Sequence, residues 1–198
     1  MKIISFYSDT INSNYYSQSA FRLKHDCERL KLDYHIENLQ GHSEYKKNCK
    51  MKPSFILDCI KKFNQPVVWL DCDSRIVKAP QFLDLERVDY AGVKRGGNND
   101  PVMIASTLYF NTTDSSLKLL EEWSRRCSLE ENNDRADHSI LLDLIKEELD
   151  SNLVFSWLPD SYGGIWNRGM TDNFIRENFT IFTKLAPARE INGKFGTK

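Results

Sequence analysis

A short apolar run that ends at two acidic residues constrains this chain more than any other segment. Residues 67–70 read Val-Val-Trp-Leu, and Asp71, Cys72 and Asp73 follow directly. An unbroken apolar run of this length is typical of a strand that helices cover on both faces. Ligands of open α/β sheets bind where such strands end. The sequence therefore predicts a buried strand with a binding site at its carboxyl end.

The two aspartates are candidate metal ligands. Alternate side chains of an extended backbone point the same way, so Asp71 and Asp73 can both face one cation. Neighbouring carboxylates repel each other unless a positive charge lies between them, and carboxylate oxygens suit Mg²⁺ or Mn²⁺. An Asp-x-Asp triplet also arises by chance in solvated surface turns. The position of this triplet, directly after a buried strand, favours the metal site.

Length and charge narrow the possible functions. With 198 residues, 40% of them hydrophobic, we expect one domain over residues 1–198. A net charge of −1 and a pI near 6.4 argue against nucleic acid or an anionic membrane as partner. The apolar runs are far shorter than the roughly 20 residues that span a bilayer. Five cysteines without a Cys-x-x-Cys pair fit reduced thiols, so we expect a cytoplasmic protein.

Hydrophobic spacing predicts alternating strands and helices in the first half of the chain. Apolar and β-prone runs predict strands over residues 3–7, 34–38 and 67–70. Spacings of three and four predict helices over residues 16–30 and 53–63, and residues 41–48 read as a polar loop. This order favours parallel strands with right-handed crossovers, and hence an α/β sandwich whose binding crevice lies at the carboxyl ends of the strands.

The second half of the chain is less regular. Residues 88–93, 104–110, 154–157 and 179–182 are predicted strands, and residues 94–100 form a very polar loop. Leu and Ile at helical spacing predict one helix over residues 117–127 and another over residues 140–149. Strands and helices therefore continue in this half, without the strict alternation of the first.

Three segments resemble the GT-A fold glycosyltransferases, which use a nucleotide-sugar donor and a divalent cation held by an Asp-x-Asp motif. Residues 69–73 look like the strand and metal motif of that family, and Lys52-Pro53 lies where members place a basic residue ahead of the preceding helix. Residues 105–111, with Trp123 on a following helix, are similar to the segment that lines the acceptor side. The resemblance implies a single-domain, Rossmann-like α/β/α sandwich with a mixed central sheet.

The resemblance also implies an activity. It indicates a metal-dependent, hexosyltransferase-type enzyme that moves a sugar from a nucleoside-diphosphate sugar to a glycan or protein-linked glycan. A UDP-sugar is favoured over a GDP-sugar as donor, with Mn²⁺ or Mg²⁺ as cofactor. Small catalytic domains of this kind occur in bacterial surface-glycan systems and in large DNA viruses that glycosylate their own capsids. The implied location is the cytoplasm, which in the viral case is that of the host.

The same resemblance assigns roles to acidic residues. Asp73 is expected to bind the cation directly, and Asp71 to bind it through water or to hold the ribose. Asp137, followed by His138, resembles a residue that members with retaining chemistry place near the transferred sugar, which makes Asp71 and Asp137 the catalytic candidates. Asp137 also fits a helix N-cap, where its carboxylate would accept from free amides. Retaining members commonly add a histidine ligand near the carboxyl end, where this chain has none, so water or a residue such as Asn192 would complete the shell of the cation.

Further residues are candidates for contact with the nucleotide-sugar. An aromatic ring at the end of the first strand can stack on a base, although such rings are as often core residues. Arg75 is either a cation that counters phosphate charge or a solvated surface group, and the aromatic residues 157–166 suit sugar stacking, a lid or plain packing. Cys72 faces away from its neighbours and is expected to pack. The candidates for nucleotide-sugar binding are Phe6, Tyr7, Ser8, Asp9, Lys52, Asp71, Cys72, Ser106, Asp137 and His138.

Two other functions remain open at this point. A hydrophobic strand ending in Asp-x-Asp also begins haloacid-dehalogenase-type phosphatases, in which Asp71 would be the nucleophile. Those enzymes place the motif on the first strand, whereas two β-α units precede it here, and they have Thr or Val where this chain has Arg75. The second alternative is a non-catalytic module that binds a nucleotide-sugar.

Overall fold

The fold is an α/β arrangement built on a mixed sheet. The computed structural model describes residues 1–9, 13–82, 85–95, 102–148, 152–165 and 171–183. Within these residues, six strands form the central sheet in the order β2-β1-β3-β6-β5-β7. In chain order they are β1 (Lys2–Tyr7), β2 (Tyr34–Asn38), β3 (Val67–Leu70), β5 (Tyr90–Arg95), β6 (Val102–Phe110) and β7 (Phe155–Leu158).

One strand of the central sheet, β6, runs opposite to the other five. Strand β1 pairs in parallel with β2 and with β3, whereas β6 is antiparallel to both β3 and β5. Strand β7 lies at the edge and is parallel to β5. The register places Leu70 opposite Thr107, so β3 ends beside the middle of β6. Consequently, the carboxyl ends of β1 and β3 and the early residues of β6 meet at one edge of the sheet.

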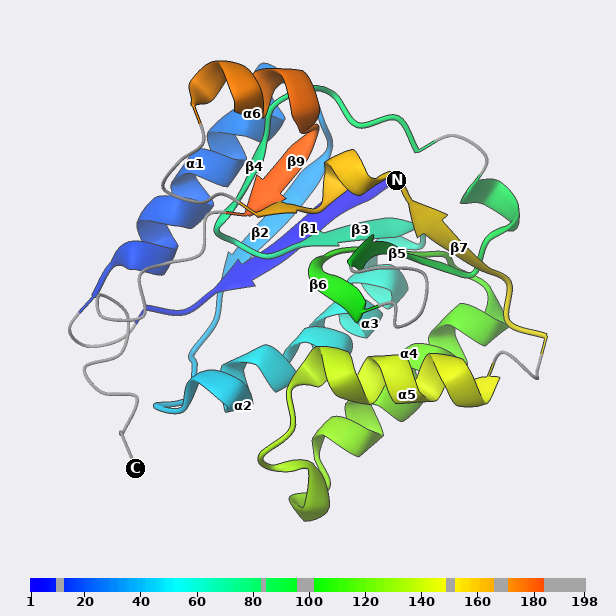
Figure 1. Cartoon of the computed structure of the whole chain (residues 1–198). Helices are drawn as coiled ribbons and strands as arrows, with labels where there is room; N and C mark the ends of the chain where they lie inside the picture. The colour runs from blue at the N-terminus through cyan, green and yellow to red at the C-terminus, as the bar shows by residue number, and fades with distance from the viewer. Residues whose placement is uncertain (10–12, 83–84, 96–101, 149–151, 166–170, 184–198) are drawn as a thin grey trace.

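Helices and a small second sheet cover the two faces of the central sheet (Figure 1). Helices α3 (Lys52–Phe63), α4 (Asp114–Cys127) and α5 (Asp137–Glu148) contribute to one hydrophobic cluster, in which Trp123 is fully buried. Helix α1 (Tyr15–Arg29) belongs to the cluster on the other face. Burial on both faces explains why β3 is apolar at every position.

The second sheet lies on the α1 face. It consists of β4 (Ser74–Ile76), β9 (Ile181–Thr183) and β8 (Gly164–Ile165), in that order. An ion-pair network joins it to α1, because Arg75 Nε lies 2.6 Å from the buried Asp26, which also accepts from the amide of Ile76. Arg75 is therefore engaged in the fold, and the prediction that it could counter phosphate charge is not supported.

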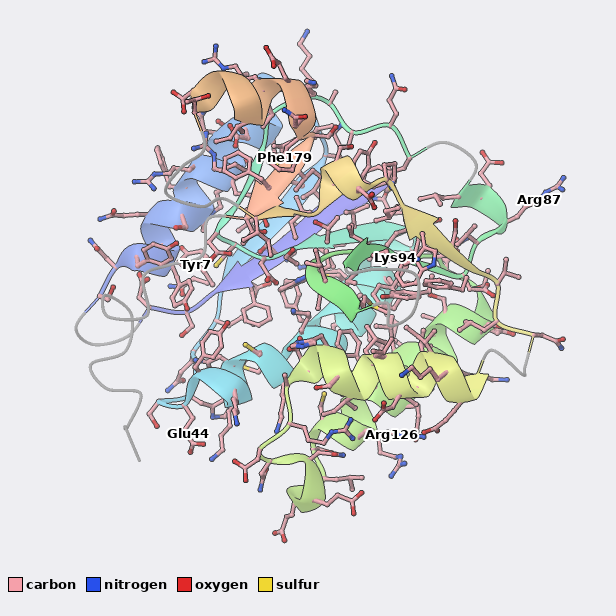
Figure 2. The ribbon with its side chains drawn as sticks, viewed as in Figure 1. Tyr7, Glu44, Arg87, Lys94, Arg126 and Phe179 are labelled. Carbon is pink, nitrogen blue, oxygen red and sulfur yellow. The ribbon has the colours of Figure 1, made fainter. Side chains whose placement is uncertain are left out.

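Short elements complete the described chain. They are helices α2 (Tyr45–Lys50) and α6 (Asp172–Asn178) and the 3₁₀ turns η1 (Leu85–Arg87), η2 (Glu130–Asn132) and η3 (Asp160–Tyr162). In Figure 2, Tyr7 at the end of β1 and Glu44 at the start of α2 lie at the same side of the molecule. None of the helices in the described ranges is long and apolar enough to cross a membrane.

The structure confirms the predicted fold class and most of the predicted elements. Strand β2 has the predicted bounds, while β5 begins at Tyr90, two residues after the predicted start, and includes Lys94 and Arg95, which the sequence placed in a polar loop. The prediction of a loop over residues 41–48 is wrong from Tyr45 onwards, where α2 begins. Isolated helices of six residues are unstable in water, so contacts with the rest of the fold must hold α2.

Candidate functional site

A cavity of about 310 Å³ lies at the carboxyl ends of β1 and β3. This volume is within the range of small-molecule sites, roughly 300–1,000 Å³. Its walls come from the ends of these two strands, the first half of β6, and helices α1, α2, α3 and α5. The lining residues include Tyr7, Ser8, Tyr45, Asn48, Cys49, Lys52, Trp69, Asp71, Asp73, Ser106, Asp137 and His138.

A buried lysine joins two of the aspartates in this cavity. Lys52 Nζ lies 2.9 Å from Asp137 Oδ2 and 3.2 Å from Asp71 Oδ1, and it donates to the carbonyl oxygen of Ala105 at 3.1 Å. The side chains of Lys52 and Asp137 are each 7% exposed. An ammonium group has three protons, so these three oxygens can use all of them. Lys52 lines the cavity, but its charge is already shared by two carboxylates.

Asp71 is held in place by its neighbours at the end of β3. Its amide donates to the carbonyl oxygen of Ser106 at 3.0 Å, which continues the pairing of β3 with β6 by one residue. The Trp69 indole nitrogen donates to Asp71 Oδ1 at 2.9 Å, and Lys52 pairs with the same oxygen. One carboxylate oxygen of Asp71 is thus fixed by the protein. Asp71 Oδ2 is left as the oxygen that could turn to a ligand.

Asp73 has an unusually high affinity for protons. Burial, followed by the negative charge of Asp71, raises the pKa of Asp73 to about 7. A carboxylate that costs this much free energy to ionise is one that a cation would stabilise. In the described chain no three His, Cys, Asp or Glu side chains gather as a metal-binding group. Two carboxylates suffice for Mg²⁺ when substrate phosphates and water supply the remaining oxygens, so the donor set fits such an ion.

Asp137, in contrast to Asp73, stays ionised at neutral pH. Burial acts to raise the pKa of this carboxyl, but the charge of Lys52 and contacts with His138 and Lys52 outweigh it, and the pKa falls to about 2. Asp137 begins α5, yet no described backbone amide donates to its carboxylate, and the first helical amides bond to the carbonyl oxygen of Ala136. The N-cap interpretation is therefore not supported. The carboxylate faces Lys52, and Trp123 Nε1 donates to the Asp137 main-chain oxygen at 3.0 Å.

The cavity brings together most of the residues predicted to bind the nucleotide-sugar. Phe6, Tyr7, Ser8, Lys52, Asp71, Cys72, Ser106, Asp137 and His138 all line it. Asp9 is not among the lining residues; it accepts from the amide of Ser17 in the first turn of α1 at 2.9 Å. Asn192, which the sequence offered beside water to complete the shell of the cation, lies outside the described residues.

The two longer segments singled out in the sequence contribute little to the cavity. Within residues 105–111, Ala105 and Ser106 line it, whereas the buried Thr107 hydroxyl donates to the carbonyl oxygen of Tyr162 at 2.8 Å. Within the described part of residues 157–166, only Ile165 lines the cavity. Residues 107–110 belong to β6 and residues 157–158 to β7, and residue 166 is outside the described residues.

One wall of the cavity was missed by the sequence analysis. Tyr45, Asn48 and Cys49 line it from α2, whose first four residues were interpreted as part of a polar loop. Burial raises the pKa of the Cys49 thiol to about 11, with the charge of Asp137 as the next contribution, which shows how near this helix lies to the aspartates. The spacing of Tyr45 and Cys49, four residues apart, is the one signal that could have indicated a helical face here.

Comparisons with known proteins bear on the fold. No protein-family model matches the chain, and no curated protein matches its sequence. A glycosyltransferase involved in the glycosylation of the major capsid of PBCV-1 is similar in structure, with a TM-score of 0.73 at 10% identity over 95% of this chain and 94% of that chain. Galactosyltransferase LgtC, solved with donor and acceptor sugar analogs, has a TM-score of 0.55 at 12% identity, over 95% of this chain and 88% of that chain.

A third solved structure is similar over a smaller share of its length. The glycosyltransferase GlyE of Streptococcus pneumoniae TIGR4 has a TM-score of 0.55 at 16% identity, over 81% of this chain and 45% of that chain. At identities this low, likeness is evidence for the fold alone. The mixed six-stranded sheet flanked by helices agrees with these neighbours. The chain described here has the fold of the GT-A glycosyltransferases.

Proposed function

We propose that the protein is a divalent-cation-dependent glycosyltransferase that uses a nucleoside-diphosphate sugar. One observation carries the proposal: Asp71, Asp73 and Asp137 line a single cavity at the carboxyl edge of a sheet with the GT-A fold. The close pair, with one carboxyl of raised pKa, suits a cation. Asp137, kept ionised by Lys52, is the separate carboxylate near the reacting sugar.

The residues divide the work as follows. Asp73 and the second oxygen of Asp71 would hold Mn²⁺ or Mg²⁺, and the ion when bound neutralises the charge that builds on a departing diphosphate. Asp137 presents a negative charge to a sugar on which positive charge develops during transfer. Trp69 and Lys52 fix Asp71, and Lys52 fixes Asp137. Preorganised charges of this kind act most strongly where water is excluded.

The donor and acceptor follow from the same proposal. Phe6, Tyr7 and Ser8 at the end of β1 would contact the nucleoside, with a UDP-sugar favoured over a GDP-sugar. A glycan, free or linked to protein, is the proposed acceptor, and the similarity to a glycosyltransferase of capsid glycosylation supports this choice. We further propose that residues 1–198 form one catalytic domain that acts in the cytoplasm.

Ligand-dependent stability tests the proposal directly. Thermal unfolding would be followed with UDP, GDP or ADP, each with and without Mn²⁺, because a ligand that binds only the native state raises the melting temperature. We expect a rise that needs both the diphosphate and the ion and that disappears in Asp73→Ala. Asp58→Asn is the matched control, since Asp58 is an exposed carboxylate on α3. An equal rise in Asp73→Ala would contradict the proposal.

Turnover separates the proposal from its two rivals. A phosphatase of the haloacid-dehalogenase type would hydrolyse an aryl phosphate without nucleotide and lose this activity in Asp71→Asn. A binding module would show diphosphate binding but no hydrolysis or transfer of sugar from a UDP-sugar or GDP-sugar. The fold does not favour the phosphatase. Of the two carboxylate oxygens of Asp71, Oδ1 is bonded by Trp69 and Lys52, which leaves Oδ2 for a ligand.

A further inference from the structure

Helix α2 lines the cavity with one set of side chains and contacts the segment before α5 with another. Tyr45, Asn48 and Cys49 line the cavity. Lys46 and Lys50 extend instead to the chain that links η2 to α5, and Figure 1 shows α2 beside the start of α5. One short helix therefore contacts both the cavity and the segment that precedes Asp137.

The lysine contacts are made to main-chain oxygens at three successive positions. Lys50 Nζ donates to the carbonyl oxygen of Asn132 at 2.5 Å and to that of Asn133 at 2.9 Å. Lys46 Nζ donates to the carbonyl oxygen of Asp134 at 2.7 Å. Carbonyl oxygens at the end of a helical turn carry partial negative charge, so ammonium groups are well suited to them. The Asn132 carbonyl oxygen also accepts from the amide of Arg135 at 3.0 Å.

The target of the clamp is itself fixed to the core. Asn132 is 5% exposed, and its side-chain amide donates to the carbonyl oxygen of Arg126 at the end of α4 at 2.9 Å. Three residues beyond Asp134 the chain reaches Asp137, whose main-chain oxygen is bonded by Trp123. Residues 132–134 can thus transmit the position of α2 to Asp137 without a long flexible connection.

A second set of contacts holds the other end of this wall. Asn48 closes a ring with His42, accepting from the His42 amide at 2.6 Å and donating to its carbonyl oxygen at 3.0 Å. Gly41 lies so near Ser8 that an added Cβ would be 2.1 Å from Ser8 Oγ. The wall formed by residues 41–50 is thus bounded by Ser8 at one end and by residues 132–134 at the other.

We propose that Lys46 and Lys50 are positioning residues for the glycosyl transfer proposed above: they clamp α2 against residues 132–134 and thereby set the distance between the α2 wall and Asp137. This inference rests on the proposed function for its kinetic consequence. Its structural part, a clamp that keeps the partly buried Cys49 beside Asp137, does not depend on that function.

Lys47 is a lysine on the same helix that pairs with Glu44 and not with residues 132–134. It lies between the two clamp residues in sequence, and its ammonium pairs with the exposed carboxylate of Glu44, one turn earlier. Lys47→Met therefore removes the same charge from the same helix without touching residues 132–134. It is the matched control for Lys50→Met and for the double variant Lys46→Met/Lys50→Met.

The first test measures the reactivity of Cys49 with a maleimide, followed by mass spectrometry of the peptide that contains it. We expect the double variant to increase the labelling rate on the order of tenfold, because hydrogen bonds to charged groups oppose opening of the helix. Lys47→Met should label at the parent rate. Lys50→Arg keeps a charged group that can donate to both carbonyl oxygens, so this variant should label as slowly as the parent. A parent rate in the double variant would overturn the proposal.

The second test uses sugar transfer. We expect Lys50→Met to lower kcat by about 10- to 100-fold, since small misplacement of a catalytic group is costly. The UDP concentration that gives half of the Mn²⁺-dependent rise in melting temperature should be unchanged. A general loss of folding would shift this concentration. Unchanged kcat in an active enzyme would overturn the positioning role. If the parent protein transfers no sugar while the labelling result holds, the proposed function fails and the clamp stands.

Discussion

Lys52 Nζ lies 2.9 Å from Asp137 Oδ2, and both side chains are 7% exposed. This pair joins α3 to the first residue of α5, while the same ammonium reaches Asp71 beyond β3. Three elements distant in sequence therefore meet at one buried charge. Removing this charge leaves carboxylates in a poorly solvated place, which makes it the most sensitive position of the site.

We predict that Lys52→Met lowers the free energy of unfolding by about 3–5 kcal/mol, because one partner of a buried ion pair is left uncompensated. Urea unfolding of the cation-free protein would measure it. Lys61→Met is the control on the same helix, since its pair with Glu121 is about half exposed and worth at most about 1 kcal/mol. Recovery of part of the loss in Lys52→Met/Asp137→Asn would locate the cost in Asp137. Equal losses for Lys52→Met and Lys61→Met would contradict the prediction.

The depressed pKa of Asp137 predicts a dependence of stability on pH. The folded-state pKa of about 2 is below the usual value of about 3.9, so ionised Asp137 stabilises the fold above pH ~4, and this contribution is lost as the pH falls through 2. We expect the parent to exceed Asp137→Asn by about 2 kcal/mol at pH 6, a gap that narrows toward pH 2. Denaturant unfolding would measure this difference in free energy, and a difference that stays constant from pH 6 to pH 2 would contradict the prediction.

The raised pKa of Asp73 predicts the opposite dependence of stability on pH. Its folded-state pKa of about 7 lies above the unfolded value, so the associated stability is fully present below pH ~4 and is lost as the pH rises through 7. Asp73→Asn should therefore melt several degrees higher than the parent at pH 8 without a cation. Added Mn²⁺ with UDP should reverse the order, because the variant loses a proposed ligand. A lower melting temperature for the cation-free variant would contradict this account.

The sequence was informative wherever a local pattern decides the structure. The apolar run before Asp71 and the three-and-four spacings of α1, α3, α4 and α5 are such patterns, and each indicated its element. The second sheet was not foreseen as a unit, because β4 pairs with β9 more than a hundred residues later, and three-residue strands carry no period of their own.

The charges of the site show the same division. Asp71 and Asp73 could be chosen from their position after β3, and Asp137 from a family resemblance. The sequence could not show that Asp71, Asp137 and the Ala105 carbonyl share Lys52. These contacts depend on how α3 packs against β6 and α5. The part played by α2 was likewise hidden, because main-chain oxygens of residues 132–134 have no sequence signature.

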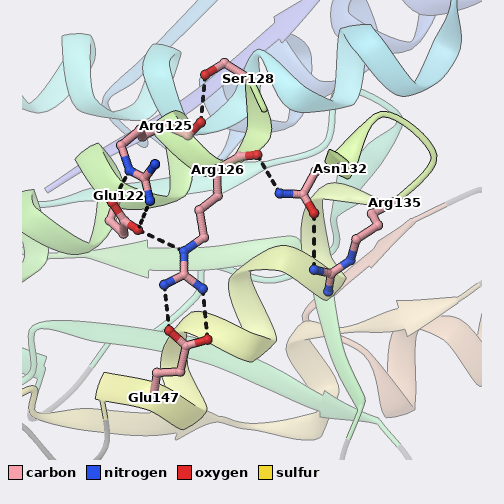
Figure 3. A network of polar contacts seen from close by, with 7 residues as sticks. All are labelled: Glu122, Arg125, Arg126, Ser128, Asn132, Arg135 and Glu147. Carbon is pink, nitrogen blue, oxygen red and sulfur yellow. Dashed lines mark hydrogen bonds and ion pairs between the residues drawn. The ribbon is translucent and has the colours of Figure 1, made fainter. Parts of the chain in front are cut away.

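A surface network outside the cavity should affect stability alone. Arg126 on α4 donates to Glu147 on α5 at 2.9 and 2.6 Å and to Glu122 at 2.8 Å (Figure 3). Because Glu147 is 55% exposed, we expect Arg126→Met to cost only about 1 kcal/mol, and less in 1 M salt. Arg125→Met, which removes a pair within α4, should cost less still. Sugar transfer should be unchanged in both, and a large kinetic effect would argue against this division.

The close approach of Gly41 to Ser8 offers a size-exchange experiment at the mouth of the cavity. An alanine Cβ at position 41 would lie 2.1 Å from Ser8 Oγ and 2.7 Å from Ser8 Cβ, distances that force the loop or Ser8 to move. We predict that Gly41→Ala weakens Mn²⁺-dependent UDP binding about tenfold and costs about 1–3 kcal/mol of stability, as overpacking does. Titration calorimetry and urea unfolding would measure the two effects.

A paired variant distinguishes a local clash from a general disturbance of the loop. Ser8→Gly/Gly41→Ala removes the two Ser8 atoms nearest to the new methyl group and leaves Asn48 Oδ1 at 2.9 Å, so it should recover part of the lost affinity and stability. Ser43→Ala, an exposed change in the same loop, should bind UDP as the parent does. If Ser8→Gly/Gly41→Ala binds no better than Gly41→Ala, the contact between residues 8 and 41 does not set the width of the cavity. Recovery would show that this wall is held at Ser8 by steric fit, while hydrogen bonds hold it at residues 132–134.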